Sequence, residues 1–161
     1  MLLWFAGVSV VVVWSGFQSP AIDYRRGVLG SVLPLADGLA GRAALLHSLV
    51  ASVAVLAAVM LATRGRRLVR RRWIGLPIGM MMHLVLDGIW ARAEVFWWPF
   101  FGFGFPAEAV PELDRSVVVP LLLEAVGVAC LVWVYRGFGL ADPARRAELL
   151  RTGQLDRDLA R

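Results

Sequence analysis

Four long apolar runs, separated by polar segments, dominate the sequence. They cover residues 1–17, 43–63, 73–91 and 116–135. A helix needs about 20 apolar residues to cross the roughly 30 Å hydrocarbon layer of a bilayer. Each run therefore predicts a membrane span, although the first is a little short. We expect an all-α, polytopic integral membrane protein with four transmembrane helices.

The polar segments between these runs predict loops and a tail. Residues 18–42 contain prolines, glycines and charges, which favour a loop with turns, and residues 92–115 favour a longer loop. From Arg136 onward the sequence becomes polar. Asp142-Pro143 is typical of a helix start and Gly153 of a helix end. We expect a membrane domain over 1–136 and a polar cytoplasmic tail with a short helix over 137–161.

Charge fixes the expected orientation. The chain is 59% hydrophobic with a net charge of +5, and all 17 of its basic residues are arginines. Six arginines lie within 64–72 and six more from Arg136 onward, whereas five are spread over the other two loops. The positive-inside rule places the arginine loop and both termini in the cytoplasm. Arginines beside apolar spans also indicate contact with membrane lipids, and no soluble face is left for a nucleic-acid partner.

The cysteine content and the choice of basic residues bear on disulfides and on the source of the protein. Cys130 is the only cysteine, so a disulfide within the chain is excluded. The use of arginine without lysine, together with abundant alanine, glycine and valine, suggests a GC-rich bacterial source. These points place the protein in a bacterial cytoplasmic (inner) membrane as a multi-pass protein.

Ionisable residues inside the apolar runs point to a functional site. His83 and Asp87 are four residues apart, which places both side chains on one face of a helix. A carboxylate near the bilayer centre costs roughly 2.5–3.5 kcal/mol, so its presence by default indicates function. With the predicted topology, His47 and Asp87 lie about 6 Å, and His83 and Glu124 about 12 Å, below the outer surface. This shared depth predicts one site.

The residue types at this depth suit a divalent metal ion. Imidazole and carboxylate ligands are typical of zinc, with manganese and iron as alternatives. Asp37, His47, His83 and Asp87 would form a four-ligand shell. Glu94 or Glu124 would then position or deprotonate a water molecule. The alternative interpretation is that these polar groups only hold helices together.

The same residues carry a resemblance to a known family. The chain resembles the membrane-bound metal-dependent hydrolases of the YdjM type over about residues 30–102, on four ordered motifs: Leu33-Pro34-Leu35-Ala36-Asp37, His47-Ser48, His83-Leu84-Val85-Leu86-Asp87-Gly88 and Trp98-Pro99-Phe100. The resemblance implies a multi-spanning bacterial membrane protein with His/Asp metal ligands and a hydrolase activity. A more distant similarity to zinc-dependent phospholipase C-like helical enzymes would suggest phosphodiester substrates.

The chain departs from the family pattern at three positions. Leu35 stands where the pattern has an aspartate, Arg42 where it has a histidine, and Leu46 where it has a threonine. The loss of two potential ligands argues against a two-metal site and allows a non-catalytic relative.

We hypothesise that the protein is a metal-dependent hydrolase whose site opens toward the outer leaflet. Its expected substrate is an ester or phosphoester of a lipid or envelope intermediate, because the membrane plane gives the easiest access to such a site. Two other classes stay open: a non-catalytic membrane scaffold or assembly protein, and a small transporter that handles metal ions.

Overall fold

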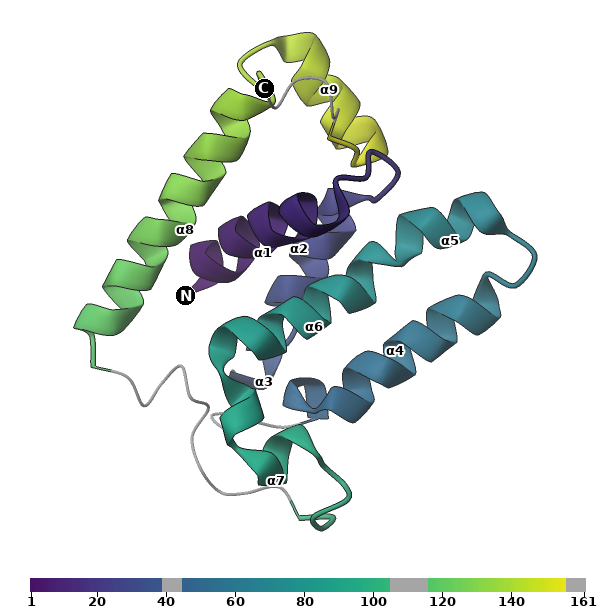
Figure 1. The fold of residues 1–161 in the computed structure, drawn as a ribbon, viewed down its shortest axis with the longest axis vertical. Helices are drawn as coiled ribbons and strands as arrows, with labels where there is room; N and C mark the ends of the chain where they lie inside the picture. The colour runs from purple at the N-terminus through teal and green to yellow at the C-terminus, as the bar shows by residue number, and fades with distance from the viewer. Residues whose placement is uncertain (39–44, 105–115, 156–161) are drawn as a thin grey trace.

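A computed structural model describes residues 1–38, 45–104 and 116–155 of the chain, and Arg42 and Arg115 lie outside these ranges. Every regular element in the described residues is a helix, which confirms the predicted all-α class. Figure 1 shows how these helices are arranged. In chain order they are α1 (Leu2–Phe17), α2 (Tyr24–Val32), α3 (Leu35–Gly38), η1 (Leu45–His47), α4 (Leu49–Ala62), α5 (Arg67–Trp73), α6 (Gly75–Asp87), η2 (Ile89–Ala91), α7 (Ala93–Phe96), α8 (Val118–Gly137) and α9 (Pro143–Thr152).

Among the described helices, α8 alone is both long and apolar enough to cross a membrane by itself. It has 20 residues, and α1 and α4 are apolar but shorter, with 16 and 14 residues. A helix rises about 1.5 Å per residue, so α4 reaches only about 21 Å. The coarse prediction of apolar helices is confirmed, and the number of spans stays a prediction.

Helix α2 occupies a stretch for which we predicted a loop. Its N-cap is Asp23, whose side chain accepts a hydrogen bond from the Arg25 amide at 3.2 Å. Glycines normally weaken a helix, but here they allow α2 to pack closely on α6. A Cβ atom on Gly30 would lie 2.0 Å from the Leu76 carbonyl oxygen, and one on Gly79 would lie 2.0 Å from the Gly27 carbonyl oxygen. The two backbones therefore touch, and only glycine fits.

Helices α1 and α8 also meet through glycine, and they run in the same direction. A Cβ atom on Gly7 would lie 2.3 Å from the Gly127 carbonyl oxygen. Near their other ends, the Trp14 ring lies 5.5 Å from Phe138 and 5.6 Å from Trp133. Our prediction had the first and fourth spans running in opposite directions. The difference arises because α2 adds one passage of the chain along the bundle (Figure 1).

Two predicted spans are shorter in the structure because local signals end them. The second begins at Leu49, since the Ser48 hydroxyl caps α4 by accepting from the Ala51 amide at 3.1 Å. The third ends at Asp87, because Gly88 adopts a left-handed conformation with φ 75°. His47 consequently lies in the turn before α4, and Glu94 does not continue the helix face of Asp87.

The tail helix α9 forms as predicted, between the Asp142 cap and Gly153, and it packs on the rest of the protein. The Tyr24 amide donates to the Gly153 carbonyl oxygen at 2.7 Å, and Leu155 is buried beside Phe138 and Val134. The division into a membrane domain and a separate tail stays a prediction.

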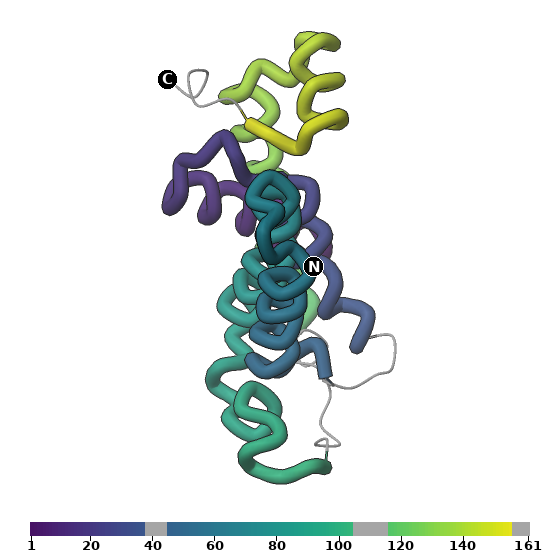
Figure 2. The backbone as a smooth tube through the Cα atoms, turned by 90° about the vertical axis from the view of Figure 1, so that its right-hand side faces the viewer, coloured from purple at the N-terminus to yellow at the C-terminus, as the bar shows by residue number. Residues whose placement is uncertain are grey.

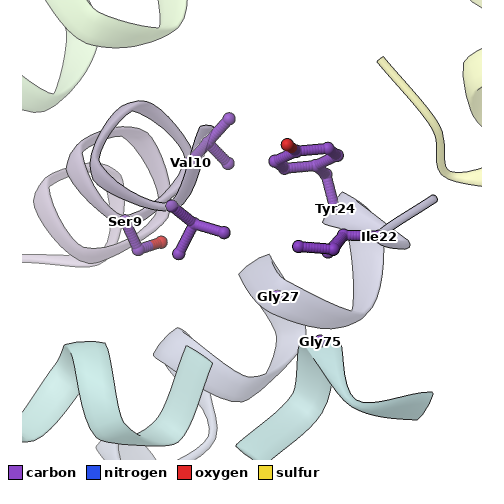
Figure 3. Close-up of a pocket in the computed structure, with 7 residues that line it drawn as sticks. Ser9, Val10, Ile22, Tyr24, Gly27 and Gly75 are labelled. Atoms are coloured by element: carbon purple, nitrogen blue, oxygen red, sulfur yellow. The ribbon is translucent and has the colours of Figure 1, made fainter. Parts of the chain in front are cut away.

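The hydrophobic core at the α9 end includes a small apolar cavity. Figure 3 shows Val10, Ile22 and Tyr24 facing it, with Gly27 and Gly75 where α2 meets α6. Its volume of about 10 Å³ leaves room for about one water molecule at most. Figure 2 shows α9 and α7 at opposite ends of the molecule, with the helices between them.

Candidate metal centre

The last turns of α6 carry the first two residues of the site. His83 and Asp87 are one turn apart on this helix, and both side chains are buried, with 0% and 1% exposure. Gly79, one turn earlier, brings α6 against α2 on this side. The spacing thus turns both polar groups toward the interior of the bundle rather than toward lipid.

The third residue comes from the turn before α4. His47 ends the short helix η1, and the Ser48 hydroxyl donates to the Leu45 carbonyl oxygen at 2.7 Å, which closes this turn. The imidazole of His47 is fully buried. Its Nε2 atom lies 3.4 Å from Nε2 of His83, and the two rings meet edge to face at 79°.

The side chains of His47, His83 and Asp87 form one compact group, the His/Asp cluster. One ligand atom from each of His47, His83 and Asp87 lies within 4.8 Å of the others. His47 is 36 positions before His83 and 40 before Asp87 in the sequence. The packing of α4 against α6 brings the turn that carries His47 next to the last turns of α6. The described residues therefore contain a buried set of two imidazoles and one carboxylate.

Hydrogen bonds to the other ring nitrogens fix the direction in which both imidazoles present their Nε2 atoms. Nδ1 of His83 lies 2.7 Å from the Ser31 carbonyl oxygen, and Nδ1 of His47 lies 3.1 Å from Oδ2 of Asp37. A carbonyl oxygen and an ionised carboxylate only accept, so each Nδ1 carries the proton in a neutral ring. Both Nε2 atoms then present lone pairs, and these lone pairs converge.

This arrangement fits a divalent metal ion. Two lone pairs at 3.4 Å repel one another unless a cation or a proton lies between them. Two nitrogen ligands of a tetrahedral zinc ion, at about 2.0–2.1 Å each, lie about 3.3 Å apart. Asp87 adds the negative charge that a dication prefers nearby. The donor set suits zinc, and it also suits manganese or iron when water supplies further ligands.

Asp37, a predicted ligand, lies behind His47 rather than in the three-residue group. Its Oδ2 atom contacts Nδ1 of His47 and also accepts the Leu46 amide at 2.8 Å. Carboxylates in this position orient a metal-binding imidazole and raise its basicity. Leu46, one of the departures from the family pattern, thus contributes its backbone to the same network. Leu35 lies in α3, the helix that carries Asp37.

The two predicted catalytic carboxylates are not part of this group. Oε2 of Glu124 accepts the backbone amides of Leu3 and Trp4, at 2.8 and 3.1 Å, and thereby caps the N-terminal end of α1. Glu94 is exposed on α7, after the chain has left the α6 direction at Gly88. The prediction that either residue faces the metal ligands is therefore not supported by this geometry.

Two contributions to the site have no signal in the sequence. The Ser31 carbonyl oxygen orients His83, but a backbone group leaves no trace in residue identity. Phe5 of α1 stacks on the His83 ring, with centroids 3.9 Å apart and planes inclined by 26°. Phe5 is fully buried within an apolar run and is indistinguishable there from an ordinary core residue.

The comparisons with known proteins support the motif-based resemblance. Neither the comparison with curated proteins nor that with solved structures gives a match. A family model described as YdjM inner membrane protein matches residues 4–146. This match spans most of the chain and includes Phe5, Ser31 and all the residues of the His/Asp cluster. The chain therefore belongs to the YdjM inner membrane protein family.

Proposed function

We propose that this protein binds one divalent metal ion through His47, His83 and Asp87. We propose further that it uses the ion to hydrolyse an ester or phosphoester of a lipid or envelope intermediate. The observation that carries the metal site is the 3.4 Å approach of two Nε2 atoms whose Nδ1 partners already hold both rings in place.

The number of ligands favours a hydrolytic site over a purely structural one. Structural zinc sites are usually closed by four protein ligands, whereas catalytic sites have three and keep a position for water. The group in the described residues has three. A bound dication would lower the pKa of a water molecule at the remaining position and polarise an ester or phosphoester oxygen. Asp37 and the Ser31 carbonyl would hold the imidazoles in one orientation throughout.

The membrane orientation belongs to the same proposal. The arginine-rich segment 64–72 lies at the end of the bundle where α4 finishes and α5 begins, whereas His47 precedes the start of α4. The positive-inside rule then assigns α5 and α9 to the cytoplasmic side and the His/Asp cluster to the outer half of the membrane. Because α1 runs parallel to α8, this arrangement puts the α1 start on the outer side, whereas the arginine counts alone predicted a cytoplasmic N-terminus. A lipid or envelope intermediate would reach the cluster from that side.

Full burial of the ligands supports a second candidate, a metal-binding protein without turnover. His47, His83 and Asp87 are each 1% exposed or less. A metal held there could stabilise a membrane scaffold, or could be cargo in a small transporter. These alternatives share the metal site with the hydrolase and differ from it only in chemistry.

The first test measures metal content. The protein is purified in detergent and analysed by elemental mass spectrometry, together with His83→Gln, Asp87→Asn and the control Asp142→Asn, which alters an exposed aspartate cap on α9. We expect about one dication per chain in the wild type and the control, and a loss of at least about tenfold in the two site variants. Equal metal content in wild type and His83→Gln would refute the metal centre.

The second test separates hydrolysis from metal storage. Metal-loaded protein in mixed micelles is given a carboxylic ester lipid and a phosphodiester lipid, and release of fatty acid and of phosphate ester is measured. The hydrolase proposal expects turnover of one of them that disappears in His83→Gln and after chelation. Stable metal binding without turnover of either class would favour the scaffold or transporter.

A further inference from the structure

The arginine-rich segment, residues 64–72, is charged and exposed. Five of its six arginines are exposed, and within the residues that the structure describes none of the six forms an ion pair. The segment is not a plain loop, because Arg67–Trp73 is the helix α5, which leads into α6 at Ile74. Its positive charge therefore lies on a structured surface, where it would attract an anion from outside the chain.

An apolar groove runs beside this charge, between α4 and the α5–α6 segment. Its volume is about 450 Å³. The main lining side chains are Val55, Val59 and Ala62 of α4, Val69 and Trp73 of α5, and Leu76 of α6. From Val55 to Ala62 the groove follows α4 for roughly 10 Å. This length and composition match a segment of hydrocarbon chain.

Arg70 connects the groove with the charge. Its Nη2 donates to the carbonyl oxygen of Thr63, another lining residue, at 3.4 Å. Its Nε atom is buried and has no acceptor within the described residues. A guanidinium N–H group that is buried without an acceptor is unfavourable, and an anionic oxygen would supply a strong acceptor for the Arg70 guanidinium.

Trp73 forms a fixed wall of the groove. Arg26 of α2 lies over the Trp73 ring at 4.4 Å from its centroid, and Arg26 is itself held by Asp23 at 3.2 Å. The ring is thereby held from the α2 side and stays 42% exposed on the other. The groove is thus preformed rather than dependent on a mobile aromatic side chain.

We propose that this groove binds one acyl chain of an anionic glycerophospholipid, with the lipid phosphate on Arg70 and the neighbouring arginines. The apolar lining alone would accept any lipid chain. The exposed arginines and the acceptor-free Nε of Arg70 select an anionic headgroup. The site lies on the arginine-rich side, away from the His/Asp cluster, and it does not depend on the metal centre.

The test counts lipids bound to the intact protein. Detergent-purified protein is titrated with palmitoyl-oleoyl phosphatidylglycerol or phosphatidylcholine, and native mass spectrometry reports the bound lipid. Arg70→Gln removes the phosphate contact, and its control is Arg146→Gln, an exposed arginine on α9. Ala58→Trp fills the groove, and its control is Ala57→Trp, an exposed neighbour outside the lining.

We expect one tightly bound phosphatidylglycerol per chain in the wild type and both controls, with at least about fivefold preference over phosphatidylcholine. Arg70→Gln should lose this preference, and Ala58→Trp should lose binding of both lipids. Equal loss of preference in Arg70→Gln and Arg146→Gln, or unchanged binding in Ala58→Trp, would overturn the proposal. If native mass spectrometry shows the wild type as a dimer and Ala58→Trp as a monomer, the groove binds a second copy of the chain, and the lipid proposal is overturned. Ala62→Leu replaces Ala58→Trp if circular dichroism shows that the latter is unfolded.

Discussion

A single methyl group at the α2–α6 contact should disturb both packing and metal binding. In Gly79→Ala, the added Cβ atom would lie 2.0 Å from the Gly27 carbonyl oxygen and 2.8 Å from the Ser31 amide nitrogen. Ordinary van der Waals contact begins near 3.4 Å, so α2 and α6 must separate by about 1.4 Å. His83 lies one turn further along α6, and its Nδ1 is held at 2.7 Å by the Ser31 carbonyl.

The size of the effect follows from this displacement. A shift of that size at Ser31 would stretch the His83 hydrogen bond to about 4 Å, which breaks it. Overpacking costs about 1–3 kcal/mol and loss of one buried hydrogen bond about 1 kcal/mol. We expect a loss of roughly 2–4 kcal/mol and a fall of the unfolding temperature on the order of 10 °C. Metal affinity should fall about 10–100-fold, because the ring loses its orienting partner.

The assay compares thermal unfolding and metal content in detergent with those of Gly137→Ala. A Cβ atom on Gly137 meets nothing within 4 Å, so this control should be neutral or stabilised by up to about 1 kcal/mol. If Gly79→Ala and Gly137→Ala unfold at the same temperature and bind equal amounts of metal, the close backbone packing does not position His83.

Three further predictions concern single residues. Asp37→Asn should reduce metal affinity about 10–100-fold in a competition titration with a chelating dye, because its carboxylate orients His47. Glu124→Ala should lower the free energy of unfolding by about 1–2 kcal/mol through loss of the α1 cap, with metal content unchanged. Burial raises the pKa of Tyr24 to about 12. The contribution of Tyr24 to stability should be constant below about pH 10 and should be lost between pH 10 and 12, so that stability falls less steeply there in Tyr24→Phe, as followed by thermal unfolding.

Each of these has an outcome that contradicts it. Unchanged metal affinity in Asp37→Asn would mean that the carboxylate does not act through His47. Loss of metal in a folded Glu124→Ala protein would return Glu124 to the site. Between pH 10 and 12 the Tyr24 phenol stays protonated in the folded protein, whereas the unfolded chain loses this proton. Deprotonation therefore favours the unfolded chain, and the free energy of unfolding falls as the pH rises. A rise in stability between pH 10 and 12 would therefore contradict its burial.

The sequence was a good guide to apolar helices and a poor one to α2. Hydrophobicity alone predicts α1, α4 and α8, since each lies in a nearly continuous apolar run. Helix α2 carries Arg25 and Arg26 in its first turn and holds Gly27 and Gly30, which in isolation favour a loop. Those glycines are explained only by the α6 backbone on the other side of the contact, information that a local pattern does not contain.

The site was predictable where side chains supply the chemistry. The spacing of His83 and Asp87 placed them on one helix face, and the shared depth with His47 correctly predicted that the three side chains meet. Glu124 passed the same depth criterion but caps α1, because depth says nothing about the direction around a helix axis. Glu94 depended on continuation of α6, which the left-handed Gly88 prevents.

The contact between α2 and α6 has a constant offset with consequences for exchanging parts among relatives. Asp23 meets Gly75, Gly27 meets Gly79, and Ser31 meets His83, each pair 52 positions apart. Each contact position on α2 is therefore matched to one particular position on α6. One residue inserted between Gly79 and His83 would turn the imidazole by about 100° around the α6 axis. A chimera that imports α6 without its matching α2 would lose the close glycine contacts between the two backbones. Such parts should be transplanted only as a pair.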